Sequence, residues 1–169
     1  LDEVLKDAGL VLADLDLLAF GRGPGSFTGV RIATGMIQGL ALGSGLKVAG
    51  VSTLEAMAQQ ALTAKQTETR QTETKQTETK QASWVVCATD ARMGEVYFAI
   101  YKSENGSLEE VVAEQVCPPE IAVAHINDTI VSNEEAMGEF EPVGTGWQAY
   151  PALQALLPEG HEVSIQFPD

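Results

Sequence analysis

The stretch of residues 28–46 constrains the fold more than any other part of this sequence. A helix is predicted over residues 28–43, and no charged side chain occurs from Ile32 to Leu46. A surface helix normally has a polar face, and a helix that is apolar on all sides must be covered on all sides. One side can pack on a sheet of the same chain, so the other side needs a second helix or another protein.

Three glycines in this helix, Gly35, Gly39 and Gly43, follow one another at intervals of four residues. This spacing places them in one row on one helix face. A glycine inside a helix costs about 0.8–1 kcal/mol relative to alanine, so Gly35 and Gly39 together cost about 2 kcal/mol. A row of small residues allows a second helix to approach closely. We therefore expect a helix-packing face here.

Apolar side chains beside the row can supply the contact area of such a face. The expected interface combines the glycine row with apolar residues of this helix and of a second amphipathic helix at residues 1–10; its members are Ile32, Gly35, Met36, Gly39, Leu40, Gly43, Val4 and Leu5. The pattern leaves open whether the helix at residues 1–10 covers part of the row or whether another chain covers it.

The glycine-rich turn before this helix, Gly21–Gly29, has the layout of a phosphate-binding loop but not its pattern. It lacks the lysine and the glycine spacing of a Walker loop, and it also fails the G-x-G-x-x-G dinucleotide pattern. The simpler interpretation is a tight strand-to-helix turn in which Ser26 or Thr28 caps the helix. The alternative is an anion site at the helix start. Its residues would be Arg22, Gly25, Ser26, Thr28 and Arg31.

Hydrophobic patterning along the rest of the chain predicts an α/β protein with helices packed on a sheet. A helix is expected to begin at Ser52, and the QTET-type repeats of residues 66–80 are expected to form a solvated loop. Strands are predicted at 17–20, 46–51, 84–89, 95–101, 108–116, 129–132, 142–144 and 162–167, and further helices at 118–127 and from 147 to 157.

Charge and cysteine content limit the function classes. The formal net charge is −14, and 13 carboxylates but no lysine or arginine follow Lys102. Because affinity for nucleic acid comes mostly from basic side chains, we expect no direct binding of nucleic acid. Two cysteines make no disulfide framework and favour the cytoplasm. No apolar run is long enough to span a membrane.

Three stretches closely resemble signatures of the bacterial TsaB (YeaZ) family. They are the turn and helix from Gly21 to Ala41, the segment Asp90–Tyr97, and Gly144–Trp147. The resemblance implies a fold of the actin/Hsp70/sugar-kinase superfamily, with two similar ribonuclease-H-like subdomains and an apparent truncation at both ends. Residues 1–63 would be part of the N-terminal subdomain, without its first strands, and residues 64–82 would be a low-complexity repeat loop. Residues 83–169 would supply the remaining strands of the N-terminal subdomain and part of the C-terminal subdomain.

The resemblance also implies a function. In this family the protein is a non-catalytic partner in making threonylcarbamoyladenosine beside the anticodon of tRNA. It binds the transferase TsaD, is joined by TsaE through that complex, and pairs with itself in isolation, using helices that match residues 1–10 and 28–43. No cofactor is expected on this chain, and ATP and metal are expected on the partner proteins. An ATPase that uses the Gly23–Gly29 turn is the main alternative, and a peptidase is a weaker one.

The sequence contains few groups of residues that could form a catalytic site. The only histidines, His125 and His161, lack the spacing of a zinc peptidase, so no metal site is predicted. Asp90, Arg92 and Glu95 could form an acid/base set, but we prefer an ion-pair network in which Arg92 bridges carboxylates and stabilises a hairpin turn. Cys87 lies among apolar residues and is expected to be a buried, inert thiol. No catalytic residue is therefore assigned.

Overall fold

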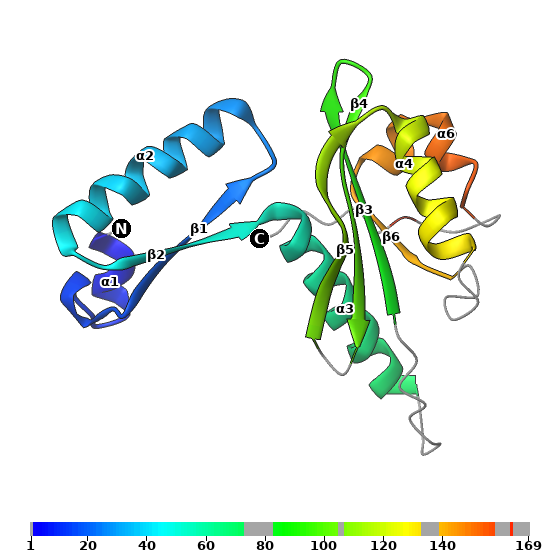
Figure 1. The fold of residues 1–169 in the computed structure, drawn as a ribbon. Helices are drawn as coiled ribbons and strands as arrows, with labels where there is room; N and C mark the ends of the chain where they lie inside the picture. Colours follow the sequence, from blue (N-terminus) through cyan, green and yellow to red (C-terminus); the bar gives the residue numbers. More distant parts are fainter. Residues whose placement is uncertain (1, 73–82, 105–106, 133–138, 158–162, 164–169) are drawn as a thin grey trace. The chain divides into compact units, whose positions relative to one another are not determined.

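The computed structural model describes residues 2–72, 83–104, 107–132, 139–157 and 163. The chain divides into two compact units, Leu1–Thr53 and Leu54–Asp169, called here the N-terminal and the C-terminal unit. Both combine helices with β-sheet (Figure 1), which confirms the expected α/β class. The expected ribonuclease-H-like subdomains and their boundaries stay predictions.

The N-terminal unit holds one long helix on a two-stranded parallel sheet. Its elements are α1 (Asp2–Asp7), η1 (Leu12–Asp14), β1 (Leu17–Gly23), α2 (Phe27–Ser44) and β2 (Lys47–Ser52). β1 pairs with β2 in parallel, with Leu18 opposite Val48. α2 runs beside this pair of strands (Figure 1), and the side chains of Leu18 and Ile37 are buried. α2 thus uses one face for packing on its own sheet.

Both ends of α2 follow from local chemistry. At its start the Ser26 side-chain oxygen accepts a hydrogen bond from the backbone N–H of Gly29, which confirms Ser26 as the cap. At its end Gly45 adopts a left-handed conformation with φ of 73°, and its N–H donates to the carbonyl oxygen of Ala41 at 2.8 Å. A glycine is favoured there because other residues are strained at positive φ.

The C-terminal unit is a four-stranded sheet with helices on both faces (Figure 1). The strand order is β5-β4-β3-β6, with antiparallel pairing except between β3 and β6. Its elements are α3 (Thr53–Thr72), β3 (Ser83–Arg92), β4 (Glu95–Glu104), β5 (Ser107–Cys117), α4 (Pro119–Ile126), η2 (Asn127–Val131), β6 (Glu141–Val143), α5 (Gly146–Ala149) and α6 (Pro151–Gln154).

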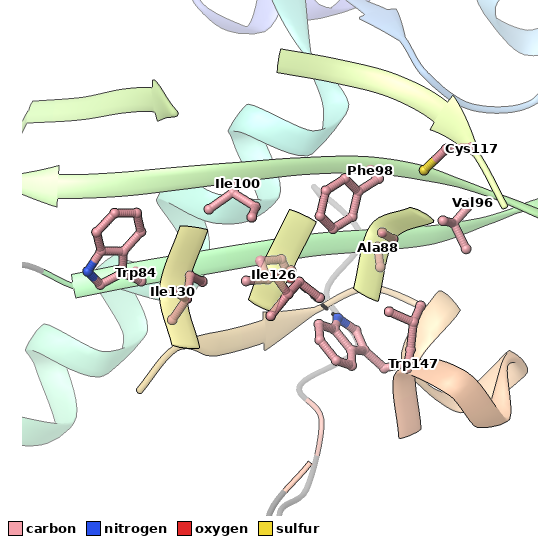
Figure 2. Packing of buried hydrophobic residues seen from close by; sticks show 12 residues of the cluster. Trp84, Ala88, Val96, Phe98, Ile100, Cys117, Ile126, Ile130 and Trp147 are labelled. Carbon is pink, nitrogen blue, oxygen red and sulfur yellow. Dashed lines mark hydrogen bonds between the residues drawn. The ribbon is translucent and has the colours of Figure 1, made fainter. Parts of the chain in front are cut away.

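Alternating side chains of β3 and β4 divide the core into two layers. One layer joins Val85, Cys87 and Ala99 to the apolar face of α3. The other joins a second set of strand side chains to α4, η2, α5 and α6; from β3 and β4 these are Trp84, Val86, Ala88, Val96, Phe98 and Ile100. Figure 2 shows Ile126, Ile130 and Trp147 of this second layer gathered against the sheet. The period-two alternation of the strands therefore explains why both faces of this sheet are covered.

Two local predictions are wrong. The segment 129–132, predicted as a strand, lies largely in η2, a π-helical turn in which the N–H of Ser132 donates to the carbonyl oxygen of Asn127 at 3.0 Å. Its β-branched residues favour a strand, but burial of Ile130 in the core outweighs that weak preference. The helix expected at 147–157 is likewise divided, into α5 and α6.

The repeats are also not loop throughout. The first copy, residues 66–70, lies within α3, which ends at Thr72. Glutamine, glutamate and arginine are good helix formers, and extending an existing helix costs far less than starting a new one. The later copies fall mainly in 73–82, which lie outside the described residues, as do most of the residues of the strand predicted at 162–167.

Candidate protein-interaction surface

The glycine row of α2 faces open space within this chain. An ideal Cβ placed on Gly35, Gly39 or Gly43 meets no heavy atom of any neighbouring element within 4 Å. All three glycines are exposed. Neither α1 nor the sheet comes close to the row, so within the described residues of the N-terminal unit the helix at residues 1–10 does not cover it.

Large apolar side chains stand exposed beside this row. Ile32 is 57% exposed, Met36 is 61% exposed and Leu42 is 89% exposed, whereas Leu40 is half-buried. Scattered exposed apolar residues are ordinary on a protein surface, but a contiguous apolar patch usually marks an interaction site. The outward surface of α2 formed by Ile32, Gly35, Met36, Gly39 and Leu42 is called here the α2 face.

The two residues predicted for the interface on α1 are less informative. Val4 is 70% exposed and Leu5 is half-buried, and no residue of α1 is buried. Their apolar surface is therefore available to another chain, although no contact in the described residues ties them to the α2 face. Their role in an interface stays a prediction.

The Gly21–Gly29 turn is organised around the start of α2. Gly23 has φ of 92°, and a Cβ there would come within 3.3 Å of a Val30 methyl group. Glycine is therefore required at this point for both conformation and space. The Ser26 hydroxyl and the Gly29 amide are engaged in the cap. This geometry agrees with a strand-to-helix turn.

The two arginines predicted for an anion site contact different parts of the N-terminal unit. The stem of Arg22 packs close to Gly50 in β2. The guanidinium of Arg31 stacks 3.3 Å from the centroid of the Phe27 ring, and its Nη1 donates to the Phe27 carbonyl oxygen at 3.2 Å. Gly25 and Thr28 are both exposed. An anion site at this turn stays a prediction.

The β3–β4 hairpin turn is held by Asp90. One carboxylate oxygen, Oδ1, accepts hydrogen bonds from the Arg92 backbone N–H at 2.9 Å and from the Tyr150 hydroxyl at 2.8 Å. The other, Oδ2, lies 3.5 Å from Arg92 Nη1. Among the described residues, the ion pair joins Arg92 to Asp90 and leaves out Glu95, which instead offers its carbonyl oxygen to Tyr150 at 3.0 Å.

The Asp90 contacts shift the titration of both groups. The Arg92 N–H and the Tyr150 hydroxyl stabilise the charged carboxylate and lower the pKa of Asp90. The same hydrogen bond raises the pKa of Tyr150. Because the side chain of Arg92 is 87% exposed, its ion pair contributes little to stability. These contacts stabilise a turn and do not by themselves arrange acid/base chemistry.

The sequence motif Gly144–Trp147 lies against this hairpin. The Asp90 N–H donates to Thr145 Oγ1 at 3.1 Å, and Trp147 Nε1 donates to the Val86 carbonyl oxygen at 3.3 Å. A Cβ on Gly144 or Gly146 would lie only 2.5 or 2.8 Å from the carbonyl oxygen of Ala88. Two motifs that are far apart in the sequence therefore share one structural role, the close packing of β3.

Among the other described groups that could react are a buried thiol and a histidine stacked on an aromatic ring. Burial raises the pKa of Cys87, whose thiol lies 3.3 Å from the Leu54 carbonyl oxygen, and the prediction of a buried thiol is confirmed. His125 stacks on Phe98, with a ring-centroid distance of 6.0 Å. In the part of the chain that the structure describes, no group of three or more His, Cys, Asp or Glu side chains could hold a metal ion. Nor is any described helix long and apolar enough to cross a membrane.

Fold and site together define an α/β protein whose most distinctive surface is an uncovered apolar helix face suited to contact with another protein. A family model described as "TsaD: tRNA N6-adenosine threonylcarbamoyltransferase" matches residues 1–167. The chain belongs to the TsaB (YeaZ) family, within the wider family that this model describes. The resemblance seen in the three sequence motifs is thereby confirmed.

Curated proteins similar to this chain are named TsaB. The TsaB protein of Escherichia coli (strain K12) is 45% identical over 152 residues, covering 89% of this chain and 56% of that protein. TsaB of Haemophilus influenzae is 44% identical over 173 residues, covering 98% and 63%. Both are described as a "tRNA threonylcarbamoyladenosine biosynthesis protein". The chain thus spans less than two thirds of the length of these curated relatives.

Solved structures similar to this chain are also described as YeaZ or as similar to YeaZ. YeaZ from Pseudomonas aeruginosa matches with a TM-score of 0.69 and 30% identity, over 99% of this chain and 67% of that one. A second structure, described as an uncharacterized protein "with similarity to peptidase YEAZ", matches with a TM-score of 0.65 and 37% identity, over 87% of this chain and 58% of that one. The fold is therefore shared over most of the chain.

Proposed function

We propose that this chain is a non-catalytic partner subunit in the threonylcarbamoyladenosine modification of tRNA. It docks a TsaD-type transferase through the α2 face. The observation that carries the proposal is the open glycine row with the exposed side chains of Ile32 and Met36 beside it. The names of the TsaB relatives support the pathway.

The same face serves self-association when the transferase is absent, and TsaE joins through the TsaB–TsaD pair. The formal net charge of −14 supports a division of labour in which the partner proteins contact tRNA and hold ATP and metal. Two free, buried cysteines support a cytoplasmic location. In this proposal the chain contributes parts of two ribonuclease-H-like subdomains of the actin/Hsp70/sugar-kinase type.

The glycine row stabilises α2 less than alanines would, and binding of a partner can offset this loss. Each glycine in the middle of α2 lowers helix stability, and within the described part of the N-terminal unit nothing packs against the row to offset this cost. An approaching helix can bring its backbone close above the row and bury the neighbouring apolar side chains. The cost of the glycines is then recovered only in the complex, as expected for a docking helix.

The experiment that tests the proposal is titration calorimetry of the full-length protein with a TsaD-type transferase. Gly39→Leu places a large side chain in the groove, where the free chain leaves space for it. We expect affinity to fall at least about 30-fold, roughly 2 kcal/mol, as at a central interface position. Gln38→Leu places a leucine on the same helix outside the row and should retain most of the affinity.

Equal affinities for wild type and Gly39→Leu would overturn the proposal. Hydrolysis assays separate it from the ATPase alternative. ATP turnover by the purified protein that is lost in Arg31→Ala would favour a nucleotide site at the Gly23–Gly29 turn. A gel shift with tRNA at physiological salt would contradict the assignment of tRNA contact to the partner.

A further inference from the structure

β5 is a long strand with a free edge. It runs over 11 residues, Ser107–Cys117, and within the described part of the C-terminal unit it pairs with β4 alone. A free strand edge presents unpaired N–H and C=O groups, to which a strand of another molecule can add. The side chains of Val111 and Val116 are 40% and 51% exposed, and exposed β-branched residues favour such pairing. The side of β5 turned away from β4 is called here the β5 edge.

The pairing of β5 with β4 is interrupted twice. Val112 of β5 lies opposite Ile100 of β4. The next pair joins Glu110 to Tyr101, so β5 uses one extra residue there, Val111. A second shift of register lies just before Ile100. Bulges of this kind bend a strand and move its backbone groups away from the regular spacing that an added strand needs.

Side chains hold this irregular stretch of β5. The backbone N–H of Glu114 donates to Oε1 of Glu110, four residues earlier in the same strand, at 3.0 Å. The Glu114 carboxylate in turn accepts a hydrogen bond from the Tyr101 hydroxyl at 3.1 Å. Hydrogen bonds to an ionised carboxylate are stronger than those between neutral groups. Glu110 thus engages a backbone amide that a regular strand would pair with a neighbouring strand.

We propose that Glu110 protects the β5 edge from strand addition. Its bond to the Glu114 amide keeps the strand bulged, and an incoming strand would have to break that bond. The incoming strand would also meet the exposed carboxylates of Glu109 and Glu110. Bulges and edge charges both oppose edge-to-edge pairing. This role goes beyond the proposed function and does not depend on the α2 face, because it concerns only the sheet of the C-terminal unit.

The test measures the Glu114 amide and self-association in full-length protein. All variants are made in Gly39→Leu, so that the α2 face is the same in each. Hydrogen exchange followed by NMR reports the protection of the Glu114 amide. Sedimentation velocity reports self-association, and the infrared amide I band identifies strands paired between molecules. Glu109→Ala is the matched control, because it removes an equal charge from the neighbouring exposed residue and leaves the bond between Glu110 and Glu114 in place.

We expect the Glu114 amide to exchange about tenfold faster in Glu110→Ala, as for the loss of a hydrogen bond to a charged group. Self-association should rise about tenfold or more and bring an intermolecular strand band. Glu110→Gln keeps an acceptor oxygen and should retain most of the protection. Glu109→Ala should exchange as its parent does and associate less than Glu110→Ala. Tyr150→Phe, destabilised at the hairpin turn, controls for a general loss of stability and should show no such band.

Three results would overturn this role of Glu110. One is an unchanged exchange rate of the Glu114 amide in Glu110→Ala. Another is unchanged self-association in that variant. The third is an equal rise in Glu109→Ala or in Tyr150→Phe, which would assign the effect to charge alone or to lost stability. None of these results bears on the proposed function, whose test is the transferase affinity of Gly39→Leu.

Discussion

Replacing the two central glycines of the α2 row by alanine should stabilise the protein in its unbound state. Gly35 and Gly39 lie inside α2, neither has a positive φ, and an added Cβ meets no heavy atom of another element within 4 Å. Nothing in the described residues opposes the extra methyl groups. The gain is therefore the full helix-propensity difference, about 0.8–1 kcal/mol per site and about 1.6–2 kcal/mol for the double variant.

Gly45→Ala is the matched control with the opposite sign. Its Cβ would also meet open space, but φ is 73°, where a non-glycine residue costs about 1–2 kcal/mol. Because the chain has two units, one global unfolding curve is a poor probe of α2. Native-state hydrogen exchange of α2 amides, measured at protein concentrations too low for self-association, reports its opening free energy directly.

The double variant should slow exchange across α2 by roughly 15- to 30-fold, the factor that corresponds to about 1.6–2 kcal/mol, whereas Gly45→Ala should speed it. Faster exchange in the double variant would refute the reasoning. That result would mean that a neighbouring element of the same chain needs the glycines, so the row would not be an open docking groove.

Three further predictions concern the C-terminal unit. Tyr150→Phe removes the hydroxyl that joins Asp90 to the hairpin and should cost about 1–2 kcal/mol in urea unfolding. Because the folded pKa of Asp90 is depressed, its stabilising contribution is present above the ordinary aspartate pKa of about 4 and is lost as pH falls through the folded value; the variant should show less of this acid-side loss. Gly146→Ala should lower stability by about 1–3 kcal/mol because its Cβ would lie 2.8 Å from the Ala88 carbonyl oxygen, and an unchanged melting temperature would contradict this. Cys87 should resist a thiol reagent in the folded protein and react on denaturation, since burial raises its pKa; rapid labelling of the native protein would argue against its burial.

The main helix of the N-terminal unit can be predicted from the sequence because its signals are local. The absence of charge from Ile32 to Leu46 and the four-residue spacing of Gly35, Gly39 and Gly43 are enough to mark an unusual helix. That helix begins at Phe27, directly after Ser26, which is one of the two predicted caps. The sequence does not say which face of the helix is covered, because that depends on where the rest of the chain folds.

The side-chain contacts of the β3–β4 hairpin turn could be predicted only in part from the sequence. Asp90 and Arg92 are close in sequence, but Tyr150, whose hydroxyl binds the carboxylate, is 60 residues away. Nothing local marks a tyrosine at that distance as a partner. Sequence proximity therefore suggests a side-chain role for Glu95, whereas in the structure its backbone carbonyl meets Tyr150.

Tertiary context also decides between helix and strand. Thr129, Ile130 and Val131 have the composition of a strand, yet burial of Ile130 beside α4 keeps them helical. The first repeat at 66–70 has no apolar residue, yet it extends a helix that α3 has already begun. In both cases the neighbouring helix outweighs the intrinsic preference of the segment.

The central claim is that the α2 face docks a TsaD-type partner. The most direct measurement is the sedimentation mass of full-length wild type and Gly39→Leu, each mixed with an equal amount of the transferase. The account predicts a single species with the summed mass for wild type and two separate species for Gly39→Leu. A stable complex of the same mass and affinity with Gly39→Leu would contradict it.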